Sequence, residues 1–567
     1  MNTFELNRWV EAICMYDEVV ARFGSAIEPE LREKVAVALF SKGDALEHLA
    51  RLEEAVDTYS EMVTRFGSAT EPALQEWVGR ALVLKGGALD RLGLPEEAIT
   101  TYDDIVVRFD KYPEFGPREK VAIALANKSS VLGRLGRPEE VISVCEEVVT
   151  KFGGDIDPVM RELAALSLLN NGLALGQLDR LEDAIAVYDE INGRYGNSPE
   201  LTLREKVATA LFNKGIALDQ LNLTEESIGV FDEAIGKFDS DTDPVMYELI
   251  ATTLLTKGIV LQRVARLEEA INTYSEVLNR LSGNVELMSP GIVARTLFNL
   301  GGDLEQLNRL DEAVTVFDEV TIRFGSFTDP VLREQVAGAL YGKGRALVRL
   351  GRLEEAMDVF NEVVTKFGGS SEPVLCVVVA QTLLAGGITL AHLGRFEEAI
   401  NAYNDVSTRL DSTTEPVLRE LFIEALFSKG VILHKLGRLE DAIDTYSEVI
   451  TRLSGDIEPT LRECVAWSIL NKGSALDQLG QLEEAMASYN EVVARFGDDT
   501  EFELLEQVPI ALFNVGATLD RLGRPEEAMD VFDEVVTRFG DDAEPTLRGV
   551  VAEALIGKGD ILARLRQ

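Results

Sequence analysis

Histidine is scarce in this chain, with three among 567 residues. The sequence also lacks an HExxH pair, a glycine-rich phosphate loop and a serine nucleophile elbow, which mark many hydrolases and nucleotide-using enzymes. Paired acids such as Glu53 and Glu54 do occur, but they recur along the whole chain. A feature repeated so often indicates structure rather than catalysis. We therefore expect a protein that is not an enzyme.

Cysteine is equally rare, with only Cys14, Cys145, Cys376 and Cys464. They lie far apart and form no CxxC pair, so neither a disulfide framework nor a zinc site is indicated. We expect no metal and no cofactor. No stretch approaches the roughly 18 apolar residues that cross a bilayer, and the N-terminal segment does not resemble a secretory signal. We expect a cytoplasmic protein.

Basic residues are outnumbered: the chain has 55 lysines and arginines against 97 aspartates and glutamates, for a net charge of -42. An acidic surface repels nucleic-acid phosphates and anionic lipid headgroups. We therefore expect neither a nucleic-acid partner nor a membrane partner.

What the chain does contain is a repeat of 43 residues that runs from end to end without insertion or deletion. Its clearest mark is a slot that holds glycine in twelve of thirteen copies, which we call the core glycine. The slot is filled by Gly43, Gly86, Ser129, Gly172, Gly215, Gly258, Gly301, Gly344, Gly387, Gly430, Gly473, Gly516 and Gly559. A period of about 20 to 50 residues indicates a solenoid, in which each unit packs on the next.

Each copy has the pattern of two helices. In residues 29–67, Pro29 suits a first helical turn, and apolar residues follow at helical spacing up to Leu49. We predict that this helix ends at Ala50. Most copies carry glycine at this position, and glycine commonly ends a helix. A second helix begins around Glu53 and ends before Gly67. We predict an all-α fold: one α-solenoid over residues 1–567, with about 13 repeats and half-repeats at both ends.

Alanine recurs from Ala12 in eleven of thirteen copies, and an aromatic residue follows four positions later in twelve. Together with the core glycine, these slots form the shared run KGxALxxLGRLEEAxxxYxEVVxRFG, which resembles the tetratricopeptide repeat. In one copy Gly86, Gly93, Ala98 and Tyr102 match the family's small, turn, alanine and aromatic slots. The repeat is longer than the family's usual length of about 34 residues.

The resemblance implies a right-handed superhelix whose first helices line a concave groove. It also implies a scaffold that binds a protein or peptide partner in that groove. Two alternatives stay open. One is a self-assembling structural array joined head-to-tail, and the other is the sensor or regulatory arm of a larger bacterial system.

Positions that vary between copies are not dictated by packing, so they are candidates for partner binding. The slot directly after the core glycine is apolar in the middle of the chain, and by the resemblance it faces the groove. The alternative is that the long first helix packs these residues internally. The candidates in this row are Leu173, Ile216, Ile259, Arg345, Ile388 and Val431.

A second row, five residues after the core glycine, is polar in every copy, and we call it the donor row. It would hold carboxylates or backbone carbonyls of a partner. Alternatively, its cations offset the helix dipole in the last turn of each first helix, and we favour this second interpretation. The candidates are Arg91, Arg134, Arg263, Arg349, Lys435 and Arg521.

The phase of the repeat places both chain ends within a repeat. The first segment presents Trp9, Ile13, Tyr16 and Phe23 without a preceding helix, and the last helix ends near Leu562. Either the chain is a fragment of a longer array, or the last helix of one molecule packs on the first helix of the next. The second arrangement would give a filament or a ring.

Overall fold

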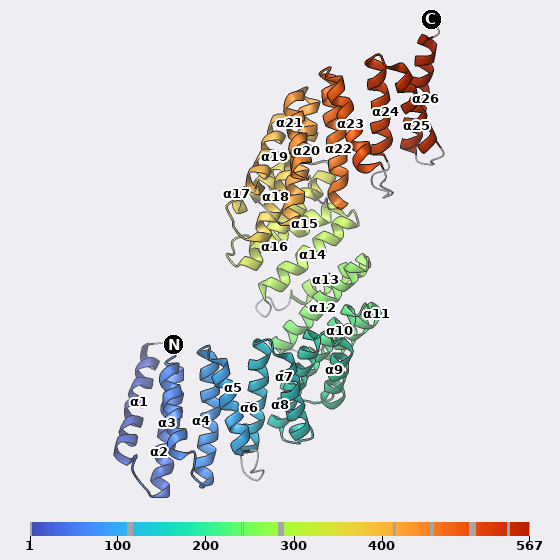
Figure 1. The fold of residues 1–567 in the computed structure, drawn as a ribbon. Helices are drawn as coiled ribbons and strands as arrows, with labels where there is room; N and C mark the ends of the chain where they lie inside the picture. Colours follow the sequence, from blue (N-terminus) through green and yellow to red (C-terminus); the bar gives the residue numbers. More distant parts are fainter. Residues whose placement is uncertain are drawn as a thin grey trace. The chain divides into compact units, whose positions relative to one another are not determined.

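A computed structural model describes residues 3–109, 117–239, 241, 243–281, 289–411, 415–453, 459–497, 506–540 and 545–565. Over these residues the chain forms 26 α-helices and no strand, so the predicted all-α solenoid fold is confirmed. The helices group into two compact units, residues 1–292 and 293–567. In each unit, successive helices stack side by side in chain order (Figure 1). The prediction of a single array over residues 1–567 stays a prediction.

The longer, even-numbered helices are the first helices of the repeats. They are α2 (Pro29–His48), α4 (Pro72–Arg91), α6 (Pro117–Arg134), α8 (Pro158–Gln177), α10 (Leu201–Gln220), α12 (Pro244–Arg263), α14 (Pro290–Gln306), α16 (Pro330–Arg349), α18 (Pro373–His392), α20 (Pro416–Lys435), α22 (Pro459–Gln478), α24 (Gln507–Arg521) and α26 (Pro545–Leu565). Nine begin at the proline that recurs in phase from Pro29, since proline at the first helical position loses no hydrogen bond.

The odd-numbered helices are the second helices. They are α1 (Thr3–Phe23), α3 (Leu52–Phe66), α5 (Pro95–Phe109), α7 (Pro138–Phe152), α9 (Leu181–Tyr195), α11 (Thr224–Phe238), α13 (Leu267–Leu281), α15 (Leu310–Phe324), α17 (Leu353–Phe367), α19 (Phe396–Leu410), α21 (Leu439–Arg452), α23 (Leu482–Phe496) and α25 (Pro525–Phe539). Most carry two acids in the first turn, such as Glu53 and Glu54 in α3, where the helix macrodipole favours negative charge.

The turn between the two helices of a repeat needs one residue in the left-handed region. Glycine takes this place in seven copies, as at Gly93 with φ of 76°. Ala50 takes it at φ 56°, and the next amide, of Arg51, donates to the Leu46 carbonyl at 2.9 Å. This is the 6→1 hydrogen bond that closes many helix C-termini. The helix end predicted at Ala50 is therefore confirmed.

The core of each repeat is the contact between the core glycine and the aromatic ring of the second helix. Tyr59 is fully buried, and a Cβ built on Gly43 would overlap its ring. The only copy without the glycine, at Ser129, is also the only copy without the aromatic residue, which is replaced by Cys145. A larger residue on one helix is thus matched by a smaller one on the other, as close packing requires.

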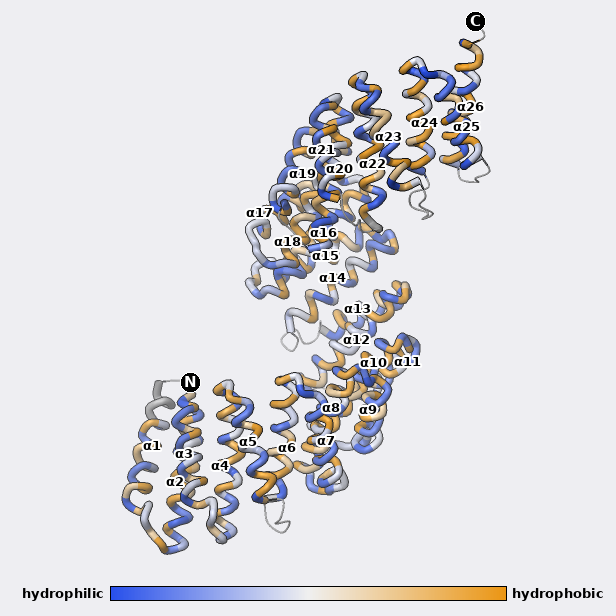
Figure 2. The backbone as a smooth tube through the Cα atoms, viewed as in Figure 1, coloured by the Kyte–Doolittle hydropathy of each residue, from blue (hydrophilic) through white to orange (hydrophobic). Residues whose placement is uncertain are grey.

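First helices of successive repeats also pack on each other, as α2 does on α4 and α18 does on α20. Successive second helices do not pack on each other to a comparable extent in the part of the chain that is described. The row of first helices is therefore the more closely packed of the two rows within each unit. Apolar and polar segments alternate along the helices (Figure 2), as expected when one face of each is buried.

Two helices, α12 and α18, are long and apolar enough to cross a membrane by length and composition alone. The prediction that no stretch approaches such a span was wrong for α18, where residues 373–391 carry no charge. About half of the apolar window of α12 and 61% of that of α18 are buried against neighbouring helices. Core helices of a repeat stack, apolar on several faces, pass the same test.

The adjacent glycines of α18 give a matched test of the glycine–ring contact. A Cβ on Gly387 would lie 2.5 Å from Cε1 of Tyr403, whereas a Cβ on Gly386 would lie 3.7 Å from Cε of Met357, an ordinary contact. We expect Gly387→Ala to destabilise by about 1–3 kcal/mol through overpacking. Gly386→Ala should be neutral or stabilise by up to about 1 kcal/mol through helix propensity. Circular dichroism melts compare them, and equal midpoints would contradict the contact.

Candidate interaction surface of the first helices

The row directly after the core glycine lies at the surface. Leu173 on α8 is 48% exposed, Ile388 on α18 is 37% exposed and Val431 on α20 is 38% exposed. Ile216 on α10 and Ile259 on α12 are half-buried. The exposed members of the row are therefore not packed inside the repeat, unlike the alternative considered from the sequence.

Neighbouring positions on the same helix faces are also apolar. Four residues before the row, one helical turn away, lie Leu169, Phe212 and Leu255 on α8, α10 and α12. Phe212 is half-buried, whereas the two leucines are buried. We call Leu173, Ile216 and Ile259 the apolar stripe, because α8 packs on α10 and α10 packs on α12.

The donor row also lies at the surface, but its arginines are already engaged within the stack. Arg91 on α4 donates to the Glu47 carboxylate of α2 at 2.9 Å. Arg134 pairs in the same way with Asp90 of α4, and Arg263 pairs with Asp219 of α10. In unit 293–567, Arg521 pairs with Asp477 and Arg564 pairs with Asp520. Each guanidinium thus bridges a first helix to the preceding first helix.

The acids of these pairs occupy one slot, four residues after the core glycine, and the sequence matches them to the arginines. The acids in this slot are Glu47, Asp90, Asp219, Glu305, Asp477 and Asp520. Each is followed by arginine in the donor row of the next copy, 44 residues later. In six further copies this slot holds a residue that is not an acid. The donor row of the next copy then carries glutamine, histidine or lysine instead of arginine. Neighbouring repeats are therefore matched by charge, a signal that comparison of the two rows would have revealed.

Glu305 of α14 is the most enclosed of these acids, with its side chain 6% exposed. Its carboxylate accepts a hydrogen bond from Arg345 at 2.7 Å. Arg349 donates to the Glu305 backbone carbonyl at 2.8 Å and to the Asn308 side chain at 3.0 Å. Arg345 and Arg349, both candidates for partner binding, are therefore held by their own repeat stack.

Where the acid is missing, the donor row is held in other ways. Lys435 lies with its ammonium 4.8 Å from the centre of the Phe396 ring, and Gln478 lies 2.8 Å from the His434 ring nitrogen. Burial lowers the pKa of His434, so this ring is neutral at pH 7 and can share a hydrogen bond with the amide. The row thus joins repeats by several kinds of contact.

At the start of this row, burial raises the pKa of Glu47, while the Tyr59 hydroxyl and the Arg91 charge act in the opposite direction. The Tyr59 hydroxyl donates to the Glu47 carboxylate at 3.0 Å. Glu47 therefore links the aromatic core of its own repeat to the guanidinium of the next one. The donor row therefore forms ion pairs within the stack. Its arginines also lie in the last turn of the first helices, as Arg91 does in α4, and the dipole effect stays a prediction.

The candidate residues of α1 differ in exposure. Ile13 is buried and Tyr16 is half-buried, whereas Phe23 is 41% exposed. The Trp9 ring stacks on His48 with centroids 4.6 Å apart. At the other end of the described chain, Leu562 of α26 is 41% exposed.

Chemically reactive groups are few among the described residues. No group of three or more histidines, cysteines or acids is placed to hold a metal ion in this part of the chain. The four cysteines are free, and burial raises the pKa of Cys145 and of Cys464 to about 12. These two thiols stay protonated at neutral pH and are poor nucleophiles.

Two family models match the repeats. A model described as Tetratricopeptide repeat matches residues 169–242, 298–371, 384–457 and 470–543, which together exceed half of the chain. A second, described as Tetratrico peptide repeat, matches residues 79–192. The chain belongs to the tetratricopeptide repeat family. Members of this family are generally non-catalytic, and the fold is typical of protein-interaction scaffolds.

Solved structures of tetratricopeptide repeat type are also similar to parts of this chain. A tetratricopeptide repeat protein from Parabacteroides merdae is 15% identical over 54% of this chain and 98% of its own, with a TM-score of 0.34. The apo form of RapI is 13% identical over 70% and 98%, with a TM-score of 0.43. The apo quorum sensor NprR from B. thuringiensis is 14% identical over 65% and 97%, with a TM-score of 0.37. No curated protein matches the sequence.

The ion pairs of the donor row should differ in strength according to their burial. We expect a double-mutant cycle of Glu305→Ala and Arg345→Ala to give a coupling free energy of about 1–2 kcal/mol, because the Glu305 carboxylate is enclosed. The matched cycle of Asp520→Ala and Arg564→Ala, whose arginine side chain is 61% exposed, should give about 0.2–1 kcal/mol. Urea unfolding measures both, and equal couplings would contradict the burial argument.

Proposed function

We propose that this tetratricopeptide repeat protein is a non-enzymatic scaffold that binds a protein or peptide on its first helices, through the apolar stripe. The observation that carries the proposal is the exposure of Leu173, with Ile216 and Ile259 half-buried in the same slot of the next two first helices. Large apolar side chains that share one exposed row over successive elements are typical of an interaction surface.

The surface suits a partner segment with apolar residues on one face. Phe212 lies one turn from Ile216 and widens the apolar area on α10. Binding of such a segment would bury the Leu173 side chain. Each Å² of apolar area removed from water contributes about 25 cal/mol to the binding free energy. A similar exposed pair, Ile388 and Val431, lies on α18 and α20 of unit 293–567, and we propose it as a second contact region.

The charge of the chain adds a preference to this apolar contact. With a net charge of -42, the scaffold attracts a cationic segment and repels an acidic one. The arginines of the donor row do not offer free charge, because their guanidiniums are paired with acids of the preceding helix. We therefore propose a partner that is apolar on one face and basic on another. The free cysteines are consistent with a reducing, cytoplasmic setting.

A peptide library displayed on phage tests the apolar stripe. We expect selected peptides to bind the wild-type chain and to lose about tenfold or more in affinity for the triple variant Leu173→Asp, Ile216→Asp, Ile259→Asp, because charges would be buried under the peptide. The matched control is Ile322→Asp on the second helix α15, where the isoleucine is 82% exposed. Peptides that bind the triple variant as well as the wild type would contradict the proposed surface.

A second candidate function is head-to-tail self-association, favoured by one observation on α26. Leu555 and Leu562 are exposed there, whereas the leucines in the same slots of α24, Leu512 and Leu519, are buried. We propose that α26 of one molecule packs on α1 of another, which would cover Phe23 as well.

Sedimentation velocity tests this association. We expect the sedimentation coefficient to rise with protein concentration for the wild type and to stay constant for Leu555→Asp with Leu562→Asp. The control variant is Val107→Asp on α5, another exposed apolar position, and it should behave like the wild type. A monomer at every concentration would rule out the head-to-tail contact and would leave the peptide-binding proposal untouched.

A further inference from the structure

The slot directly before the core glycine, which we call the lysine slot, holds lysine in nine of thirteen copies. In the six copies where an aspartate directly follows the core aromatic residue, the lysine ammonium crosses to the preceding second helix and meets that aspartate. Lys343 of α16 reaches Asp318 of α15 in this way at 2.6 Å, and Lys257 of α12 reaches Asp232 of α11 at 2.6 Å. The lysine stem is largely covered, so it fills space between the two helices while its charge is paired.

Three copies lack both members of this pair, with Leu300 and Ser275, Gly386 and Asn361, or Val515 and Asn490 in the two slots. Gly386 of α18 occupies the lysine slot, and Asn361 of α17 occupies the aspartate slot. Among the copies without lysine, the copy with Gly386 is the only one with no side chain in that slot, since the others carry Asn171, Leu300 and Val515. The copy that begins at α18 therefore loses the stem, the ammonium and the acid together.

Packing does not require the glycine at this position. A Cβ on Gly386 would meet only Cε of Met357 at 3.7 Å and the Phe360 side chain at 3.9 Å and beyond, all ordinary contacts. The residue is helical, and glycine inside a helix costs about 1 kcal/mol relative to alanine. Gly386 therefore leaves unfilled space beside α18 and does not bring α18 closer to α17.

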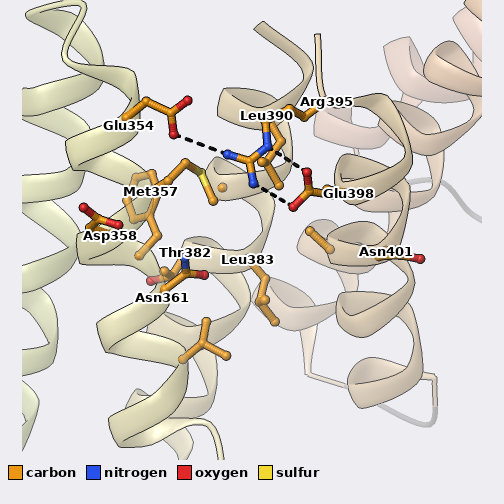
Figure 3. A pocket seen from close by; sticks show the side chains of 14 residues that line it. Glu354, Met357, Asp358, Asn361, Thr382, Leu383, Leu390, Arg395, Glu398 and Asn401 are labelled. Atoms are coloured by element: carbon orange, nitrogen blue, oxygen red, sulfur yellow. Dashed lines mark hydrogen bonds and ion pairs between the residues drawn. The ribbon is translucent and has the colours of Figure 1, made fainter. Parts of the chain in front are cut away.

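That space is a cavity of about 360 Å³ between α17, α18 and α19. Met357 and Phe360 of α17 and Leu383 and Leu390 of α18 line its apolar part. The side chain of Arg395 lies across it between Glu354 and Glu398 (Figure 3), with hydrogen bonds of 3.3 Å and 2.7 Å to their carboxylates.

The rim of the cavity is acidic. Glu354, Asp358 and Glu398 place three carboxylates there against the single guanidinium of Arg395. The hydrogen bond from Arg395 holds the pKa of Glu398 below its usual value, so this carboxylate is ionised at neutral pH. Asp358 forms no ion pair among the described residues, and it lies one helical turn before Asn361 on α17. The site therefore offers an unpaired negative charge beside an apolar wall.

We propose that this cavity binds a primary ammonium group on a short alkyl stem, as found in a lysine side chain or a free alkylamine. The stem would take the place of the missing lysine stem against Met357, Phe360 and Leu383. The ammonium would lie between the Asp358 carboxylate and the Asn361 side-chain carbonyl. This site is separate from the proposed peptide surface, because Gly386 and Ile388 are two residues apart on α18 and so lie on nearly opposite faces of the helix.

The probe that tests the site is n-butylammonium, with neutral 1-butanol as its uncharged counterpart. We expect saturation-transfer NMR to show binding of n-butylammonium to the wild-type chain, and binding of 1-butanol about tenfold weaker, because only the cation is attracted by the acidic rim. Equal signals from the two probes would overturn the proposal.

Two variants keep the net charge at -42 and locate the binding. The double variant Gly386→Lys with Asn361→Asp restores the common pair, fills the cavity and should abolish specific binding. The double variant Lys343→Gly with Asp318→Asn opens the matching space one repeat earlier and should add a second site. Circular dichroism checks that both remain folded. Binding unchanged by the first variant would place the cation elsewhere on the acidic surface and overturn the site.

The source of the ammonium is resolved by a second pair of probes. A short glycine peptide with one central lysine is compared with the same peptide carrying Nε-acetyl-lysine, which lacks the charge. Binding of the lysine peptide, lost on acetylation and in Gly386→Lys with Asn361→Asp, would support a partner side chain as the ligand. Binding of n-butylammonium but not of the peptide would support a free alkylamine. Binding of neither probe would overturn the proposal.

Discussion

The contact between the core glycine and the aromatic ring is the interaction on which every other feature of this protein depends. A ring such as Tyr59 fills the space over Gly43 and leaves no room for a Cβ. This contact sets the distance between the two helices of a repeat. It also sets the direction in which the residues before and after the glycine point. The lysine slot then faces the second helices, whereas the slot after the glycine faces solvent on the first-helix side.

Because the contact recurs in phase, interactions between repeats recur as well. Lys257 meets Asp232 and Lys343 meets Asp318 at the same distance of 2.6 Å, and the arginines of the donor row meet acids of the preceding first helix. Individually, exposed pairs of this kind contribute little. Their acids and arginines are nevertheless matched between consecutive copies, so each pair adds to a contact between adjacent units, over which the stability of a repeat array is summed.

Against this regular background, departures from the pattern are informative. Exposed apolar residues such as Leu173 and Ile388 occur where packing leaves the choice open. Gly386 departs in the opposite direction, since it removes a side chain that the stack normally uses. One kind of departure adds an apolar surface that suits a protein partner, and the other opens a cavity with an acidic rim. Both kinds depend on a scaffold in which the same pair of helices recurs from copy to copy.

The helices could be predicted from the sequence alone, because the recurrent proline, the spacing of apolar residues and the turn at Ala50 are local signals that act within a few residues. The sequence also determined which rows vary, and therefore that Leu173 and Arg91 were candidates at all. The contacts of these rows followed only from the packing of the helices: Leu173 is exposed, whereas Arg91 is held by Glu47, 44 residues earlier in the chain. The cavity at Gly386 likewise needed three packed helices to become visible. A repeat period shows which positions are equivalent, whereas the packing of neighbouring repeats shows which side chains are already paired.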